Sequence, residues 1–198
     1  GSIAACAKHF AGYGASESGR DYNTTNIPEH ELRHVHLPPF KAAIDAGVVS
    51  IMTSFSDLNG VPATGNAWLL QTVLRDEWGF DGVVVSDWES IRQLAVHGLT
   101  ADDRDSAAEA ISAGVDMEMA STTYADHLVS LVQEGRVAES KVDALVANIL
   151  RLKFRLGLFE QPYTDASHLP TPGCADHLAL AAEAARESLV LLKNAPHD

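Results

Sequence analysis

Short apolar runs alternate with amphipathic segments along most of the chain. Four runs rich in β-branched and other apolar residues predict strands at residues 3–10, 48–55, 82–88 and 115–119. Elsewhere, apolar residues recur every three or four positions, which predicts helices at residues 29–46, 66–78, 90–97, 102–113, 124–134 and 140–156. Strands that alternate with helices in this way indicate βαβ units and a parallel sheet.

Residues with special backbone preferences mark the ends of the predicted helices. Pro38 and Pro39 must break or restart the helix at 29–46, because proline lacks an amide hydrogen. Asn66 is a suitable N-cap for the helix that follows it, and Gly79 and Gly114 suit helix ends. The turn predicted at residues 56–62 contains an Asn-Gly pair.

The number of βα units bounds the architecture. About four units are visible, whereas a closed (β/α)₈ TIM-type barrel needs eight, so we interpret residues 1–159 as half of an α/β barrel. Residues 160–174 contain three prolines and little periodicity, and we interpret them as a linker. A helix at 175–188 and an apolar strand at 189–192 then predict the start of a second domain at 175–198.

The stretch GVVVSDW at residues 82–88 carries the clearest chemical candidate. Asp87 and Trp88 follow the valine run at the carboxyl end of a predicted strand, where α/β barrels place their active sites. An aspartate there can be a nucleophile, a base or a metal ligand, and an indole can support a flat or ring-shaped substrate. Asp87 is equally suited to cap the next helix, so spacing alone leaves both interpretations open.

A second polar strand end lies near the beginning of the chain. The strand at 3–10 ends in the pair Lys8 and His9, and a long glycine-rich loop follows at residues 11–28. Long loops at the top face of a barrel are often functional. In isolation, a surface lysine and a core histidine are the simpler interpretation of this pair.

Composition argues against several classes of function. The formal net charge of −13 leaves no basic surface for nucleic acid, and no apolar run is long enough to cross a membrane. Cys6 and Cys174 lack the spacing of a zinc motif, and Cys6 is predicted to be a small core residue. Since no metal cluster or phosphate-binding motif is evident, we expect neither a metal nor a cofactor.

Eight stretches, in order and with characteristic spacing, carry a resemblance to a known family. They are AACAKHFAGYGA, GRDYNTT, LRHVHLPPFKAAIDAG, MTSFSDLNGVPATGN, LLQTVLRDEWGFDGVVVSDW, AGVDMEM, ILRLKFRLGLF and ARESLVLLKN. Together they resemble the β-glucosidases of glycoside hydrolase family 3 over nearly the whole chain. The resemblance implies a (β/α)₈-type barrel followed by an α/β sandwich, so residues 1–159 would be its C-terminal half and residues 175–198 the opening of the sandwich.

The resemblance also implies a reaction. It is the retaining hydrolysis of terminal β-glucosidic bonds through a covalent glycosyl-enzyme, with the aspartate of the SDW motif, here Asp87, as the nucleophile. Retention needs a second carboxyl group about 5 Å away, which protonates the leaving oxygen. In the family this acid usually comes from the second domain, so we expect it beyond Asp198. Neither Glu89 nor Glu118 is predicted to serve, and hydrolysis by two carboxyl groups needs no cofactor.

The expected partners and location follow from the same resemblance. We expect a β-glucoside or oligosaccharide substrate and the remaining segments of the same enzyme as partners, with no nucleic acid or membrane. The sugar, the linkage and the oligomeric state, including a homodimer, stay open. The stretches resemble bacterial periplasmic members of the family, which implies a periplasmic or secreted protein. No signal peptide opens the chain, and its first residues already resemble a strand.

Sugar-binding roles are implied position by position. Lys8 and His9 match the family's sugar-binding Lys-His pair, and Trp88 matches a residue that walls the sugar site. Met52 and Phe55 match a methionine and an aromatic residue near the bound sugar.

The resemblance leaves open which group donates a hydrogen bond to Asp87 and what Arg20 contacts. Many members have Tyr-Asn where this chain has Phe55 and Ser56, so Asp87 needs a donor other than that tyrosine hydroxyl. Arg20 either reaches the sugar or pairs with a carboxylate such as Asp21 or Glu17.

Several alternatives are carried alongside the β-glucosidase hypothesis. The chain by itself is expected to be an inactive sugar-binding or structural fragment, because it contains no candidate for the acid. A β-xylosidase and a β-N-acetylglucosaminidase belong to the same family, but the stretch KHFAGYG differs from the KHFPGHG of the latter branch. A lyase that forms a Schiff base on Lys8 is a further alternative from another class.

Overall fold

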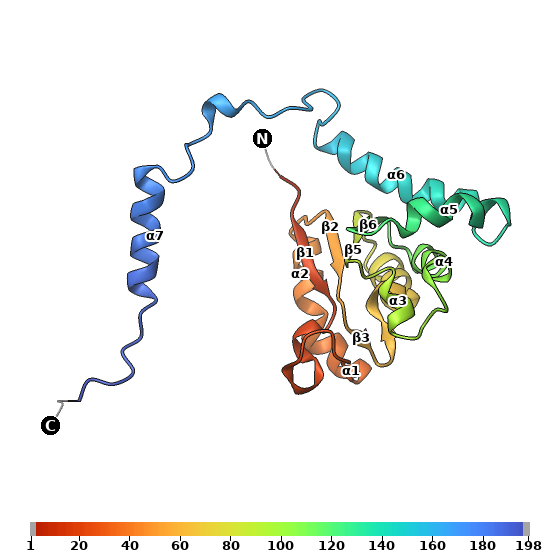
Figure 1. Ribbon diagram of the computed structural model, residues 1–198, viewed down its shortest axis with the longest axis horizontal. Coiled ribbons are helices and arrows are strands. Elements are labelled where there is room, and N and C mark those ends of the chain that lie inside the picture. Colours follow the sequence, from red (N-terminus) through yellow and green to blue (C-terminus); the bar gives the residue numbers. More distant parts are fainter. Residues whose placement is uncertain (1–2, 196–198) are drawn as a thin grey trace. The chain divides into compact units, whose positions relative to one another are not determined.

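The computed structural model describes residues 3–195 of the chain (Figure 1). They form two compact units that divide between Glu160 and Gln161. The first unit holds the four-stranded sheet, and the second holds a short 3₁₀ helix (Ala166–His168) and the helix α7 (Ala175–Glu187). The assignment of residues 160–174 to a linker and of 175–198 to a second domain stays a prediction.

Four parallel strands form the sheet of the first unit. Their order in space, β1-β2-β5-β6, is their order in the sequence. Their bounds are Cys6–Phe10, Ser50–Thr53, Val83–Trp88 and Met117–Met119. Each strand therefore joins the same side of the preceding one, as in a barrel, whereas the strand order of a doubly wound sheet reverses. The predicted α/β class with TIM-barrel character is confirmed.

The valine run of β5 is buried on both faces of the sheet. Ala7, Ile51 and Val84 lie side by side in register and pack into the main core. Val83 and Val85 point to the opposite face, because side chains alternate along a strand, and they are also buried. This is the burial that a β-branched run in a parallel sheet predicts.

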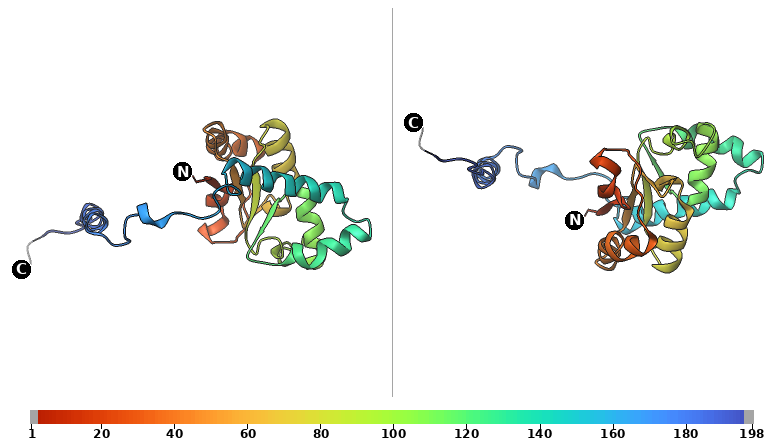
Figure 2. Two further views of the ribbon diagram at one scale, coloured as in Figure 1. Left: turned by 90° about the horizontal axis from the view of Figure 1, so that it is seen from above. Right: turned by 90° about the horizontal axis from the view of Figure 1, so that it is seen from below.

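The helices of the first unit pack their apolar faces on this sheet and on one another. The main core contains Leu32, Leu70 and Leu74 together with Phe10 and Ile51. The two helical segments that carry these leucines lie side by side in both views of Figure 2.

Among the helices of residues 3–195, none is both long and apolar enough to cross a membrane. The bounds are α1 Glu29–Glu31, a π-helical stretch Leu32–His36, α2 Pro38–Asp45, a second π-helical stretch Trp68–Glu77, α3 Gln93–Val96, α4 Asp103–Ala113, α5 Thr123–Gln133 and α6 Glu139–Arg155.

The residues predicted to shape helix ends do so. α2 begins at Pro38, in the first turn, where proline's missing amide hydrogen costs no hydrogen bond. The Asn66 side chain accepts a hydrogen bond from the amide of Leu69 (3.0 Å) and caps the stretch that follows. Gly114 ends α4 with a φ of 99°, and a Cβ atom there would collide with the Gln71 side chain.

Two sequence predictions about apolar segments are wrong. Cys6 is exposed rather than part of the core, because β1 lies at the edge of the sheet. Residues 189–192 do not form a strand, and their side chains are exposed. A strand needs a hydrogen-bonded neighbour, and the described residues of the second unit include no other strand.

A short hairpin anchors the long loop that follows β1. β3 (Asp57–Leu58) and β4 (Val61–Pro62) enclose the predicted turn. The Asn59 side chain accepts a hydrogen bond from the amide of Ile27 and donates one to its carbonyl, both at 2.8 Å. The loop at 11–28 is therefore tied to the segment that follows β2.

A buried ion pair joins the amino-terminal ends of β5 and β6. Arg75 donates to the carbonyls of Phe80 (2.8 Å) and Gly82 (2.6 Å), just before β5. It also pairs with the buried carboxylate of Asp116 (2.8 Å), just before β6. Asp116 in turn accepts a hydrogen bond from Asn148 of α6 (2.8 Å). The Arg75–Asp116 pair thus connects the π-helical stretch that carries Arg75 with the starts of β5 and β6 and with α6.

We expect Arg75→Met to destabilise the intact protein by about 3–5 kcal/mol, because the Asp116 carboxylate would stay buried without its counter-charge. Urea-induced unfolding measures the change. Arg33→Met is the matched control, since Arg33 likewise forms ion pairs, in its case with Glu29 and Glu77, but on the exposed surface. Little change is expected for the control. Equal losses in the two variants would contradict this account of Arg75.

Candidate active site

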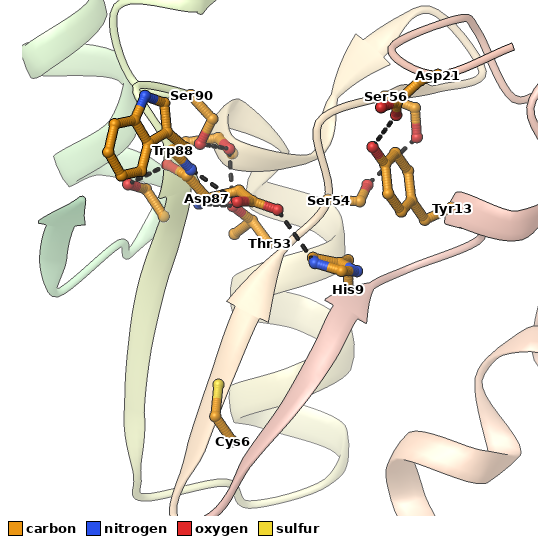
Figure 3. Close-up of polar contacts among 12 residues, drawn as sticks. Cys6, His9, Tyr13, Asp21, Thr53, Ser54, Ser56, Asp87, Trp88 and Ser90 are labelled. Atoms are coloured by element: carbon orange, nitrogen blue, oxygen red, sulfur yellow. Dashed lines mark hydrogen bonds and ion pairs between the residues drawn. The ribbon is translucent and has the colours of Figure 1, made fainter. Parts of the chain in front are cut away.

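Asp87 lies at the carboxyl end of β5 and is almost fully buried (Figure 3). Its Oδ1 accepts a hydrogen bond from the amide of Trp88 (2.7 Å), and its own amide donates to the hydroxyl of Thr53 (3.4 Å). Its carbonyl accepts hydrogen bonds from the Ser90 amide (3.1 Å) and the Ser86 hydroxyl (2.9 Å). The backbone of Asp87 and one carboxylate oxygen are therefore held in place.

The other carboxylate oxygen of Asp87 has no such bond. In the part of the chain that the structure describes, Oδ2 is the one buried side-chain nitrogen or oxygen without a hydrogen-bond partner. Nε2 of His9, on β1, is 3.4 Å away. A buried polar atom left unbonded costs about 1–3 kcal/mol, so its presence in a fold points to a use.

The alternative interpretation of Asp87 as a helix N-cap is wrong. Residues 89–92 form turns, α3 begins at Gln93, and Arg92 occupies its N-cap position. The Asp87 carboxylate bonds the amide of the adjacent Trp88 instead of an amide in α3. Asp87 therefore does not serve to start that helix.

The imidazole of His9 is favoured in its neutral form beside this carboxylate. Burial lowers the pKa of His9, the Asp87 carboxylate opposes this, and the neighbouring Lys8 ammonium lowers the pKa further. A neutral imidazole donates one hydrogen bond and accepts another. Such a group suits a ligand that carries several hydroxyls.

A chain of buried hydroxyl groups supports the strand ends. Thr53, at the end of β2, bonds Thr64 (2.8 Å), which bonds Ser90 (2.9 Å). The Ser86 hydroxyl accepts a hydrogen bond from the amide of Met119 on β6 (2.9 Å). These bonds fix the carboxyl ends of β2, β5 and β6 relative to one another, and with them the position of Asp87.

Aromatic rings from two loops lie next to His9. Tyr13 packs edge-on against His9 (5.0 Å between ring centroids), and Tyr22 is tilted over Phe55 (4.4 Å). The Tyr13 hydroxyl donates a short hydrogen bond to the Asp21 carboxylate, and burial together with this bond raises the pKa of Tyr13. Sequence reasoning missed both tyrosines, because a glycine-rich loop has no periodicity. Their position in a long loop after Lys8 and His9 is the signal that could have found them.

The other sequence-predicted residues occupy different environments. Trp88 is 59% exposed, so its indole is accessible to a ligand. Met52 lies on β2 in register with Val85. Lys8 is exposed, whereas a lysine that forms a Schiff base is typically desolvated. The structure therefore brings His9 to Asp87 and leaves Lys8 at the surface beside them.

Of the two alternatives left open for Arg20, a contact with the sugar and a pairing with Asp21 or Glu17, the described residues do not show the second. Arg20 is exposed, and within residues 3–195 Asp21 and Glu17 bond Tyr13 and Asn26 instead.

The two nearby glutamates have structural partners. Glu118 accepts hydrogen bonds from the amides of Thr123 (3.0 Å) and Tyr124 (2.8 Å), and so holds the first turn of α5. Glu89 forms an ion pair with Arg92 (3.5 Å) at the surface. Neither carboxylate is directed at Asp87 by these contacts.

The fold and the site define an α/β-barrel type of protein whose candidate reactive group is one buried carboxylate at a strand end. Residues 1–152 match the sequence model described as the glycosyl hydrolase family 3 N terminal domain. The chain therefore belongs to glycosyl hydrolase family 3, as its motifs predict.

Sequence identity to individual relatives supports this family assignment. The chain is 44% identical to a periplasmic beta-glucosidase from Salmonella typhimurium over 98% of its own length and 26% of the relative's. It is 41% identical to a putative beta-xylosidase from Formosa agariphila, over 97% and 26% of the two lengths. The solved beta-glucosidase from Listeria innocua in complex with glucose is 43% identical, with a TM-score of 0.87 over 97% of this chain and 27% of that one. The chain thus spans about a quarter of these relatives.

We expect the pKa of His9 in the intact protein to lie below its ordinary value of 6.5. Because the Lys8 ammonium lowers this pKa and the Asp87 carboxylate raises it, Lys8→Met should move the titration midpoint up and Asp87→Asn should move it down. NMR titration of histidine-labelled protein measures both shifts, with His9→Gln to assign the signal. Shifts in the same direction would be inconsistent with this arrangement.

Proposed function

We propose that this chain supplies the nucleophile of a retaining β-glycosidase that acts on terminal β-D-glucosidic or related bonds. In the proposed reaction, Oδ2 of Asp87 attacks the anomeric carbon and expels the leaving group, and water then hydrolyses the glycosyl-aspartate. The supporting observation is the asymmetry of one carboxylate: Oδ1 is held by the Trp88 amide, while Oδ2 is buried and unbonded. A carboxylate held in this way presents a lone pair without first breaking a hydrogen bond.

The acid that protonates the leaving oxygen is proposed to come from another segment of the same enzyme. Glu118 and Glu89, the glutamates nearest to Asp87 along β5 and β6, are engaged in structural contacts. Since the chain spans about a quarter of its relatives, the isolated chain is proposed to be inactive. Full activity of the purified 198-residue chain on an aryl β-glucoside would refute this part of the proposal.

Sugar binding is proposed for the polar and aromatic groups around Asp87. His9 and Lys8 would bond adjacent hydroxyls, and the exposed Trp88 indole would face the C–H groups of the ring. Phe55 is proposed to contribute through the aromatic cluster that it forms with Tyr22. Met52 and Arg20 are proposed on the family resemblance alone.

Glucose is the proposed sugar, and xylose is the second candidate. The Listeria innocua relative was solved with glucose, and the Salmonella typhimurium relative is named a beta-glucosidase. A relative of similar identity is named a putative beta-xylosidase, which keeps the second candidate open. The ratio of kcat/KM for aryl β-glucoside and aryl β-xyloside decides between them. A periplasmic location is proposed from the name of the Salmonella relative, and a homodimer stays a prediction.

Asp87→Asn is expected to lower kcat of the intact enzyme by roughly 10⁴-fold or more, the scale seen when a hydrolase loses its covalent nucleophile. Glu89→Gln is the matched control, because it makes the same change two residues away on a surface carboxylate. Steady-state hydrolysis of an aryl β-glucoside measures both variants. Near-normal turnover by Asp87→Asn would rule out the nucleophile assignment.

Trp88→Ala is expected to lower kcat/KM by about tenfold, which corresponds to about 1.4 kcal/mol of lost contact with the sugar. Trp88→Phe should recover part of the loss, because it keeps an aromatic face. Because the Trp88 amide rather than its side chain holds Asp87, the backbone bond to Oδ1 should survive both changes. If the alanine and phenylalanine variants behave alike, the indole does not stack on the substrate.

A further inference from the structure

Two histidines stand four residues apart on the segment that begins with α1, the first α-helix after β1. The sequence is His30-Glu31-Leu32-Arg33-His34, and it lies where α1 continues into the π-helical stretch. Two histidines at this spacing on one face of a helix are a ligand pattern for transition metals. Both side chains are exposed, and neither contributes to the site around Asp87.

The two imidazole rings already lie together. The ring centroids of His30 and His34 are 4.2 Å apart, with 37° between the ring planes. Two nitrogen ligands on one tetrahedral zinc ion are about 3.3 Å apart, given Zn–N bonds of about 2.0–2.1 Å. The rings are thus close enough for both to contact one ion once their exposed side chains turn toward it.

A backbone hydrogen bond sets the tautomer of one ring. Nδ1 of His34 is 2.7 Å from the carbonyl oxygen of His30. A carbonyl only accepts, so Nδ1 carries the hydrogen, and in the neutral ring the lone pair is on Nε2. A bond from the second ring nitrogen to a backbone carbonyl is the usual support of a metal-binding histidine.

Nearby charges also favour a cation. The guanidinium of Arg33, which stands between the two histidines in sequence, bonds Glu29 (2.8 Å) and Glu77 (2.7 Å). It also lies over the ring of Trp68, 5.4 Å from its centroid. The positive charge of Arg33 is therefore matched by two carboxylates.

We infer that His30 and His34 form a surface site for Zn²⁺ or a related divalent transition-metal ion, with water as the remaining ligands. The segment also has the HExxH spacing of zinc proteases, but the structure does not support that activity. Glu31 lies 3.8 Å from His36, and among the described residues no group of three or more histidine, cysteine or acidic side chains is placed to hold a metal. A bound ion would instead join α1 to the π-helical stretch.

Titration calorimetry of the metal-free intact protein with ZnCl₂ tests this site. His30→Ala and His34→Ala should each weaken Zn²⁺ binding by at least roughly tenfold to a hundredfold, because loss of a direct ligand costs no less than loss of a group that only orients a ligand. His36→Ala is the matched control, since it removes a histidine from the same segment but outside the stacked pair, and it should bind as the unmodified protein does. Electron paramagnetic resonance with Cu²⁺ should show coupling to two nitrogens, and to one in either single variant.

Three outcomes would overturn the inference. They are no Zn²⁺ binding by the unmodified protein, unchanged binding by the double variant His30→Ala/His34→Ala, and an equal loss in His36→Ala. Neither histidine belongs to the proposed active site, so the result is independent of glycosidase activity.

Discussion

The candidate site depends on a difference in hydrogen bonding between the two oxygens of the buried Asp87 carboxylate. Oδ1 of Asp87 is fixed by the Trp88 amide, whereas Oδ2 lies 3.4 Å from Nε2 of His9 without a hydrogen-bond donor in the described residues. An unbonded buried oxygen disfavours folding, so the surrounding structure must hold it in place. The hydroxyl chain through Thr53, Thr64 and Ser90 provides that support from the neighbouring strand end. In the proposed reaction, the unbonded oxygen forms the bond to the sugar.

Stability and chemistry lie at opposite ends of the same strands. At the amino-terminal ends of β5 and β6, Arg75 and Asp116 form a buried ion pair that also holds backbone carbonyls. At the carboxyl ends, Asp87 and His9 lie next to an exposed indole and a group of aromatic rings. This division is typical of α/β barrels, whose carboxyl-end loops change function while the opposite end maintains the fold. The family match supports this comparison.

Features set by local sequence could be predicted, and features set by tertiary neighbours could not. Periodicity located the strands and helices, and Asn66 caps its helix as expected because a cap acts over three residues. The exposure of Cys6 depends on β1 being an edge strand, and the missing strand at 189–192 depends on the absence of a partner among the described residues. The local sequence pattern predicts neither the exposure of Cys6 nor the absence of a strand at 189–192.

The candidate site divides in the same way. The strand-end position of Asp87 was predictable from the valine run before it, but the approach of His9 requires the order of three strands. The bond between Tyr13 and Asp21 joins two points of one irregular loop, for which no periodic pattern exists. The family resemblance implied roles for Lys8 and His9, and the structure adds that partial burial lowers the pKa of His9 while Lys8 stays exposed.

The central claim is that Oδ2 of Asp87 becomes covalently glycosylated. An activated fluoro-sugar β-glucoside slows hydrolysis of the glycosyl-enzyme more than its formation, so the intact enzyme should accumulate this intermediate. Peptide mapping by mass spectrometry can then locate the sugar. The account predicts a single sugar adduct on the peptide that contains Asp87, and none in Asp87→Asn. An adduct on any other side chain, or inactivation of the Asp87→Asn variant at the normal rate, would contradict it.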